Sequence, residues 1–364
     1  MNARERFVRV LTGRDCDRVP FMKVFGGTNA VVEKWKEDHP LVHTYIDELL
    51  GFEGGYRGWR ITPVNTGLCG TPPEISEQVT PTERHIRKGD GTLYITMNRD
   101  GHFFNHIAEY PVKNHGDWLK IKQNYMDPFA PSRFPKDWRV FTEMYAARDY
   151  PLQLTCGGVY GFARHMLGDE LLCYSLYDAP ELVADIMDTY ITMCIDIWKK
   201  MAVYIRFDLI ECWEDMAYNG GPIISKEHFD KFMAPQYRRI RGFADEAGVP
   251  LVLVDSDGYI MELSKWMYET GVNSMYPYEV QAGNDVEQIR AALPGMACIG
   301  GLDKECMARG KPAMDAELEK AAKLIPQGRF IPGPDHFVLE NVPFDNYVYF
   351  MRGLKRVVME TRLG

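Results

Sequence analysis

The chain has 364 residues, of which 46% are hydrophobic and 26% are charged, and its formal net charge is −9. This length allows one large barrel or two ordinary domains, with apolar material for a substantial core. The acidic balance argues against a nucleic-acid partner, which needs a basic face. The N-terminus shows no apolar signal segment, and no apolar run approaches the roughly 20 residues of a membrane span. We therefore expect a cytoplasmic protein with no membrane partner.

The eight cysteines form no C-x-x-C pair and have no regular spacing. In a reducing compartment this pattern is typical of buried, small hydrophobic side chains rather than of disulfides or a structural zinc site. We therefore expect free thiols.

The first half of the chain predicts few regular elements. The expected helices are residues 5–11 and 39–50, and the expected strands are 19–25 and 59–61. From residue 83 to 111, short strands flank Asp-Gly turns at 90–91 and 100–101, which predicts antiparallel pairing. This inserted β-hairpin region is too short to have a core of its own. Residues 113–138 are polar and are expected to form a connection.

From residue 150 onward, short apolar runs that end in Gly, Asp or Glu alternate with helical stretches. The expected strands are 151–156, 207–215, 250–258, 272–279, 296–303 and 330–336. The expected helices are 180–201, 226–247 (with Ser225 as its N-cap), 259–270, 285–293 and 313–324. With the two earlier strands, this makes eight. Strict alternation without a glycine-rich phosphate motif favours a single-domain α/β (β/α)₈ TIM-type barrel over residues 1–364 rather than a doubly wound sheet.

Acidic residues follow five consecutive predicted strands, at the end where such barrels hold their active sites. They are Glu211, Glu214 and Asp215, then Asp255 and Asp257, then Glu279, then Asp303 beside Lys304, and finally Asp335 beside His336. Any one of them would also serve as a cap for the following helix. A whole ring instead implies raised pKa values, a bound cation or a cationic substrate.

Two kinds of chemistry fit this ring, and both stay open because the spacing matches no diagnostic metal motif. Carboxylates and a histidine can act as general acid and base. Oxygen and nitrogen donors also suit zinc or another divalent ion. The catalytic candidates are Glu214, Asp215, Asp257 and His336. The candidate metal ligands are Asp255, Asp257, Glu279 and His336.

Other side chains near the same strand ends are candidates for binding a substrate. The aromatic ones would wall a pocket for an aromatic substrate, although packing at the barrel rim would explain them equally well. The candidates are Tyr160, Arg164, His165, Trp213, Tyr278, Asp303 and Lys304.

Ordered motifs along nearly the whole chain resemble the uroporphyrinogen decarboxylase superfamily. They are Arg6-Phe7, DRVP at 17–20, YDAPEL at 177–182, GGPIIS at 220–225, GGLDK at 300–304 and the ending at 335–347. The resemblance implies a TIM-type barrel that often forms a homodimer.

The chain departs from both activities associated with that superfamily. True decarboxylases use an N-terminal arginine-rich motif to bind the acidic tetrapyrrole, but here no arginine lies between Arg18 and Arg57. An acidic ring would also repel that substrate. Corrinoid-dependent thiol methyltransferases bind zinc through a His-x-Cys pair and a later cysteine, but here the pair is Asp255 and Asp257.

The remaining pattern, with WEDM at 213–216 and Asp335-His336, resembles a third subgroup associated with corrinoid-dependent methyl transfer. We therefore expect a methyltransferase or O-demethylase acting on a small methylated compound, such as an aromatic methyl ether. Its corrinoid (cobalamin) cofactor would be carried by a partner protein. One alternative is a decarboxylase for a smaller carboxylic acid, and another is a binding protein that has lost its chemistry.

Overall fold

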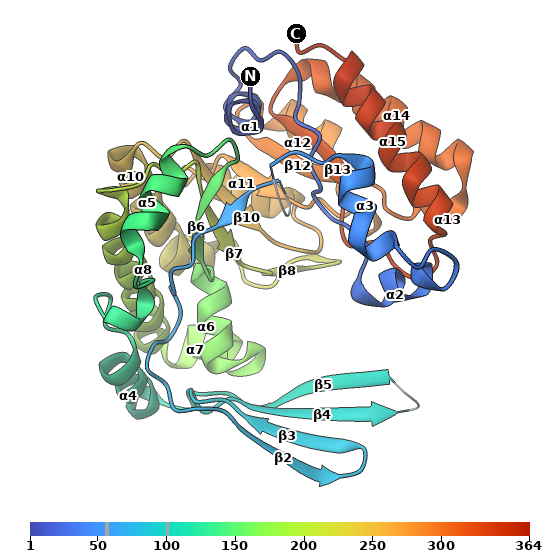
Figure 1. The fold of residues 1–364 in the computed structure, drawn as a ribbon. Helices are drawn as coiled ribbons and strands as arrows, with labels where there is room; N and C mark the ends of the chain where they lie inside the picture. Colours follow the sequence, from blue (N-terminus) through green and yellow to red (C-terminus); the bar gives the residue numbers. More distant parts are fainter. Residues whose placement is uncertain (55–57, 100–101) are drawn as a thin grey trace.

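The structure, a computed structural model, describes residues 1–54, 58–99 and 102–364. Its centre is a curled, half-barrel sheet of parallel strands surrounded by helices (Figure 1). The described strands run in the order β1-β6-β7-β10-β11-β12-β13. Their bounds are β1 Arg60–Ile61, β6 Leu152–Cys156, β7 Leu209–Trp213, β10 Leu251–Asp255, β11 Ser274–Tyr276, β12 Ala297–Leu302 and β13 Phe330–Pro334. The predicted α/β TIM-type class is confirmed, and every strand predicted after residue 150 is present.

The predicted first strand at residues 19–25 is not formed, so the described sheet has seven strands instead of eight. Among the described residues, the segment has an isolated bridge at Lys23, and a parallel bridge to Val338 follows just after it, at Gly27. One physical reason is Pro20, which has no N–H to donate to a neighbouring strand. The segment nevertheless packs against the edge of the sheet. A side-chain carbon on Gly333 of β13 would lie 2.6 Å from Val24, so the glycine makes room for it.

Helices cover the outside of the sheet, as the buried β10 run requires of a strand with both faces covered. In the first half they are α1 Ala3–Leu11, α2 Asn29–Asp38, α3 Val42–Leu50, α4 His115–Tyr125 and α5 Trp138–Ala146. Further along they are α6 Val159–Leu167, α7 Asp169–Asp178, α8 Pro180–Ala202, α9 Lys226–His228, α10 Ala234–Ala247 and α11 Met261–Tyr268. The last are α12 Val286–Ala292, α13 Cys306–Arg309, α14 Lys311–Leu324 and α15 Phe344–Glu360.

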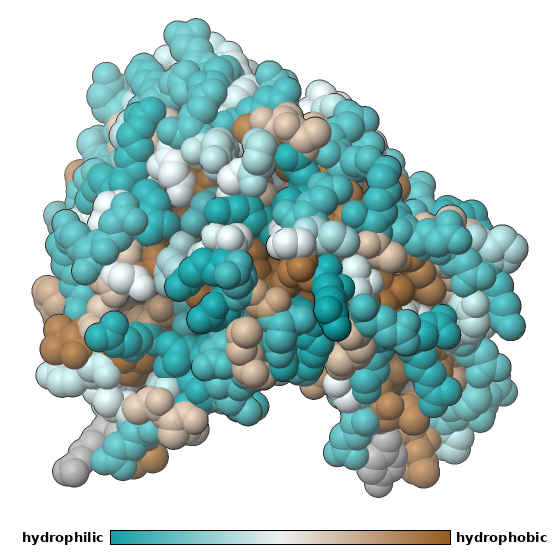
Figure 2. All heavy atoms as spheres, turned by 90° about the horizontal axis from the view of Figure 1, so that it is seen from above, coloured by the Kyte–Doolittle hydropathy of each residue, from teal (hydrophilic) through white to brown (hydrophobic). Residues whose placement is uncertain are grey.

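The N-terminal ends of the strands are covered by α1. Arg4 of α1 donates a hydrogen bond to Asp208, just before β7, at 2.9 Å. Seen from that side, the surface is mainly hydrophilic with scattered hydrophobic residues (Figure 2). Because this end is closed, the opposite ends of the strands are the place to look for a site.

Two predictions, a helix N-cap and a connecting segment, can be compared directly with the structure. Ser225 accepts a hydrogen bond from the His228 N–H at 3.2 Å, so the predicted N-cap is confirmed. The expected connection at 113–138 was wrong in part, because it contains α4, which buries Trp118 and Ile121. Three-residue spacing of these two apolar side chains places them on one helix face.

The insertion is a four-stranded antiparallel sheet that extends from the C-terminal side of the barrel (Figure 1). Its strands are β2 Ile75–Thr80, β3 Glu83–Arg87, β4 Leu93–Arg99 and β5 His102–Glu109. The predicted hairpin region is confirmed, but the prediction missed β2. The Asp-Gly turn at 90–91 joins β3 to β4, whereas the turn predicted at 100–101 lies outside the described residues.

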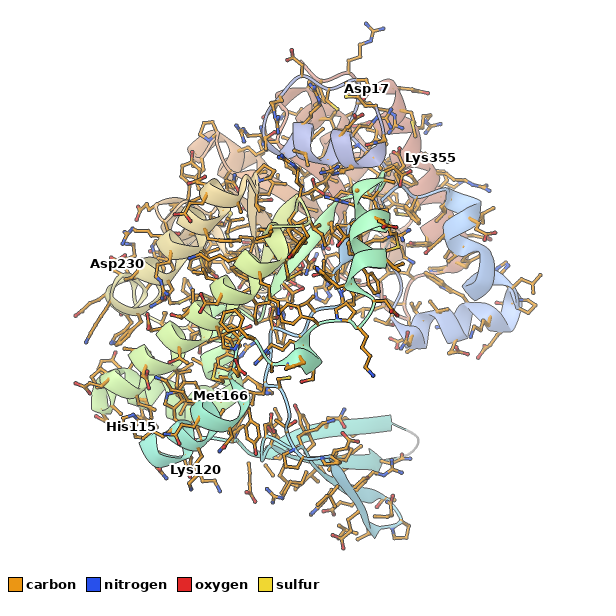
Figure 3. The ribbon with its side chains drawn as sticks, turned by 60° about the vertical axis from the view of Figure 1, so that its left-hand side comes forward. Asp17, His115, Lys120, Met166, Asp230 and Lys355 are labelled. Atoms are coloured by element: carbon orange, nitrogen blue, oxygen red, sulfur yellow. The ribbon has the colours of Figure 1, made fainter. Side chains whose placement is uncertain are left out.

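The chain leaves this sheet beside α6. The Val112 N–H donates to the Met166 carbonyl at 3.0 Å. Figure 3 shows Met166 on the same side of the molecule as His115 and Lys120 of α4, next to the antiparallel sheet. The sheet is thus attached to the barrel at the end near α4 and α6.

All eight cysteines are free, as predicted, and six of them are buried. In the described ranges, no helix combines the length and the apolar character needed to cross a membrane.

Candidate functional site at the barrel mouth

Three of the predicted residues come together at the C-terminal ends of the strands. Asp257, Glu279 and His336 each offer one ligand atom, and these atoms all lie within 4.8 Å of one another. They follow β10, β11 and β13 in turn. His336 Nε2 lies 3.4 Å from a carboxylate oxygen of Asp257. We call these three residues the mouth cluster. Two carboxylates and an imidazole are donors that suit a divalent cation.

A second acidic group adjoins the mouth cluster and shares Asp257 with it. Its ligand atoms, from Asp215, Asp255 and Asp257, also lie within 4.8 Å of one another. The Asp257 N–H donates to Asp215 Oδ1 at 3.4 Å. Burial raises the pKa of Asp215, and the nearby charge of Asp257 raises it further. The repulsion expected from a ring of carboxylates is therefore present at this point.

Neighbouring groups fix the side chains of the mouth cluster. Glu279 accepts a hydrogen bond from the Gly258 N–H at 3.0 Å and lies 3.4 Å from Lys304 Nζ. Lys304, predicted as a substrate residue, is thus the ionic partner of a cluster carboxylate. The His336 ring stacks on Phe25, with 5.1 Å between the ring centroids. Phe25 was missed by the sequence analysis, because no local pattern links it to a residue at the other end of the chain.

Glu214, a predicted catalytic residue, lies apart from this cluster. Its side chain is fully buried and accepts hydrogen bonds from the N–H groups of Val159 and Gly161 at 2.6 and 2.9 Å. The Tyr237 hydroxyl also donates to it. Burial raises the pKa of Glu214 to about 7, although these hydrogen bonds oppose the shift. Its contacts are those of an anion that caps the N-terminus of α6.

Asp335 is bound in a similar way. It is fully buried and accepts hydrogen bonds from the N–H groups of Val280 at 2.6 Å and Lys304 at 2.9 Å. Burial raises its pKa to about 6. Its contacts hold the loops after β11 and β12 together.

Three predicted substrate residues are also turned away from the cluster. Tyr160 and Tyr278 are fully buried, and the Tyr278 hydroxyl meets Ser264 at 3.4 Å. Asp303 is buried and pairs with Arg309. These side chains pack the walls of the barrel, so a direct role in binding stays only a prediction.

A cavity of about 560 Å³ lies between the antiparallel sheet and the ends of β6 and β7. We call it the side cavity. Of the predicted substrate residues, His165 and Trp213 line it. Arg164 does not, because it donates to the Asp215 carbonyl at 2.6 Å. Lys88 also lines the cavity but was not among the predicted substrate residues, because its region was interpreted only as a β-hairpin with a turn at 90–91.

A half-barrel of parallel strands with carboxylates and a histidine at its mouth defines an α/β-barrel protein with the geometry of an enzyme site. A family model described as uroporphyrinogen decarboxylase (URO-D) matches residues 141–357. Since this is more than half of the chain, the protein belongs to the URO-D family, and the resemblance seen in the sequence is confirmed.

Solved structures support the fold. A methyltransferase from Methanosarcina mazei has a TM-score of 0.62 and 15% identity, with 99% of each chain covered. At that identity, the likeness shows the fold alone. A putative vitamin-B12 independent methionine synthase from Listeria monocytogenes has a TM-score of 0.36 and 12% identity, covering 60% of this chain and 69% of its own. That likeness is too weak to carry an argument. No curated protein matches the chain.

Proposed function

We propose that the protein is a methyltransferase or O-demethylase that passes a methyl group between a small methylated compound and a corrinoid held by a partner protein. The observation that carries the proposal is the mouth cluster, in which Asp257, Glu279 and His336 converge at the end of the barrel. The URO-D family and a methyltransferase fold over the full chain length support it. Membership of the subgroup associated with corrinoid-dependent methyl transfer, which the sequence predicts, is part of this proposal.

Breaking a methyl ether leaves an oxygen that must be protonated or held by a Lewis acid. A divalent ion bound by Asp257, Glu279 and His336, with zinc as one choice, would supply that Lewis acidity. The cluster offers oxygen and nitrogen donors. These donors do not match a site in which thiolates bind the metal that activates a thiol.

The side chains of the cluster can also act on the proton directly. His336 Nε2 faces the Asp257 carboxylate at 3.4 Å, and the imidazole can serve as the acid that donates a proton to the leaving oxygen. Lys304 balances the charge of Glu279. Asp215 and Asp255 add negative charge behind Asp257, which favours a cation at this point, whether a metal ion or a proton.

The experiment is anaerobic incubation of the full chain with Co(I) cobalamin and a panel of methoxylated aromatics and methylated amines. We expect methylcobalamin from at least one substrate, followed by its absorbance. Asp257→Ala and His336→Ala should each abolish the reaction, whereas Asp245→Ala, an exposed carboxylate on α10, should leave it unchanged. Absence of methylcobalamin with every substrate, or full activity in both cluster variants, would contradict the proposal.

Decarboxylation of a smaller acid is the second candidate. It is favoured by two groups that can carry positive charge, Lys88 and His165, which line the side cavity. Neither Arg164 nor Lys304 does so, because both are bound to carboxylates or carbonyls near the mouth. Release of carbon dioxide from an aromatic acid, without methyl transfer, would select this candidate.

We also propose that the chain is a single domain that forms a homodimer. The antiparallel sheet exposes Ile75, Val79 and Phe104, which are 69%, 47% and 52% exposed. Exposed apolar groups on a sheet with free edges are typical of an association surface. Light scattering of the purified protein tests the dimer, and a single species with the mass of one chain would overturn it.

A further inference from the structure

The side cavity is built by two parts of the fold that are far apart in sequence. One wall comes from the ends of β6 and β7, from α6 and from Tyr190 of α8. The other comes from residues 66–74 and from the β3–β4 turn and β4 of the antiparallel sheet. It does not include any residue of the mouth cluster. A chain of contacts nevertheless connects the two sites. Arg164 lies near the Trp213 ring and donates to the Asp215 carbonyl, and Asp215 accepts a hydrogen bond from the Asp257 N–H.

The barrel side of the cavity is lined by the half-exposed ring of Trp213 and by the buried rings of Phe162 and Tyr190, which are 6% and 1% exposed. Phe162 stacks on Tyr190 with 3.8 Å between centroids and an angle of 3°. The Tyr190 ring is held in place, because its hydroxyl accepts the Gly157 N–H at 2.7 Å. Trp213 is 49% exposed, and the Arg164 guanidinium lies 5.6 Å from its ring centroid. A half-exposed Trp beside stacked rings is a surface that suits a planar aromatic ligand.

The sheet side of the cavity presents charge. Lys88 Nζ lies 2.5 Å from Glu74, and both side chains are about half exposed, at 45% and 53%. Exposed ion pairs of this kind contribute little, so an anion on a ligand can take the place of Glu74. Asp90 and His165 form a second pair at 3.3 Å. The pKa of Asp90 falls to about 2, because hydrogen bonds from His165 and Thr92 outweigh the effect of burial.

Asp90 therefore already has a side-chain partner in His165, whereas a ligand can recruit Lys88. We propose that the side cavity binds a planar aromatic carboxylate, with its ring against Trp213 and its carboxylate on Lys88. This inference rests on the proposed function, and it names an aromatic acid that carries a methyl group as the substrate class. From Trp213, the contacts of Arg164 and Asp215 lead to Asp257 of the mouth cluster.

The probe is p-methoxybenzoate, titrated into the full chain by calorimetry without any corrinoid. Two matched ligands separate the two halves of the recognition: cyclohexanecarboxylate lacks the ring faces, and methyl p-methoxybenzoate lacks the charge. We expect each to bind at least about tenfold more weakly than the probe. Equal affinity of cyclohexanecarboxylate and the probe, or no binding of the probe, would overturn the inference.

Variants of the protein test the same two contacts. Lys88→Met should weaken binding of p-methoxybenzoate by about tenfold but leave binding of its methyl ester unchanged. Trp213→Ala should weaken binding of both compounds. Lys113→Met is the control, because this lysine is 65% exposed and does not line the cavity. Wild-type affinity in both cavity variants would overturn the inference.

Binding and turnover can fail separately. Binding of the probe with no methyl transfer to Co(I) cobalamin would leave this inference standing and contradict the proposed function. Methyl transfer from methylated amines, with no binding of the probe, would contradict this inference and leave the proposed function standing.

Discussion

Glu214 and Asp257 both follow strands of the same barrel, but their surroundings are opposite. Glu214 is fully buried and accepts three hydrogen bonds, two of them from the first turn of α6. Asp257 is 44% exposed and faces His336 across 3.4 Å. A carboxylate after a barrel strand is therefore not a site residue by its position alone. The number of backbone N–H groups that reach it decides whether it holds the fold or is available for chemistry.

The largest expected difference between the two is in stability. Glu214→Ala should lower the free energy of unfolding by about 3 kcal/mol or more, because three buried donors lose their acceptor. Asp257→Ala should change it by less than about 1 kcal/mol, because its side chain is half exposed. Urea denaturation measures both values, and similar losses in the two variants would show that the contrast is mistaken.

The comparison also predicts a pH dependence. The pKa of Glu214 is raised to about 7 from its ordinary value of 4.5. Its contribution to stability is therefore fully present below pH 4.5 and is lost as the pH rises through about 7. Over that window the loss should be about 3 kcal/mol.

Glu214→Gln removes this titration, so its free energy of unfolding should fall less between these two pH values than that of the wild type. The free energy of unfolding of the variant should still fall by a smaller amount, because the pKa of Asp335 is also raised, to about 6. Urea titrations across the window provide the measurement. If the free energy of unfolding of the variant depends on pH as steeply as that of the wild type, Glu214 does not titrate in this window.

Metal binding, in contrast, should depend on Asp257 and not on Glu214. Asp257→Asn should weaken binding of zinc or cobalt by about 100-fold, since it removes one of three donors from the mouth cluster. Glu214→Gln should leave the affinity within about twofold, because Glu214 has no place among those donors. Calorimetry with the metal alone gives both numbers. Equal weakening by both substitutions would refute the assignment of ligands.

The smallest effect is expected where the antiparallel sheet meets α6. His165→Ala should cost less than about 1 kcal/mol, because His165 is 45% exposed. It should raise the pKa of Asp90 from about 2, since a hydrogen bond that lowers it is lost. Limited proteolysis should then cut residues 75–109 faster than in the wild type. Identical cleavage rates would show that other contacts hold the sheet.

The sequence predicted the barrel well because its signals are local. The apolar run at 251–255 is buried at every position, as a parallel strand requires, and its end leads directly to Asp257. The same logic led to Glu279 and His336, which the structure brings together. What lay within one strand and its following loop could therefore be predicted.

The remainder depends on contacts between distant segments. Tyr237 reaches Glu214 from α10, and Phe25 supports His336 from the opposite end of the chain. The position of Lys88 depends on where the antiparallel sheet docks, which no periodicity in its strands specifies. Sequence patterns set the strand ends, whereas side-chain direction and docking decide which carboxylates and cations meet.

The antiparallel sheet lies before residue 141, outside the part of the chain that matches the URO-D family model. It supplies part of one wall of the side cavity but no residue of the mouth cluster. An exchange of this segment would therefore alter the shape and charge offered to a ligand without touching the strand ends. In the function we propose, a change of ligand would thus be possible on one piece of the fold while the mouth cluster on the other piece stays as it is.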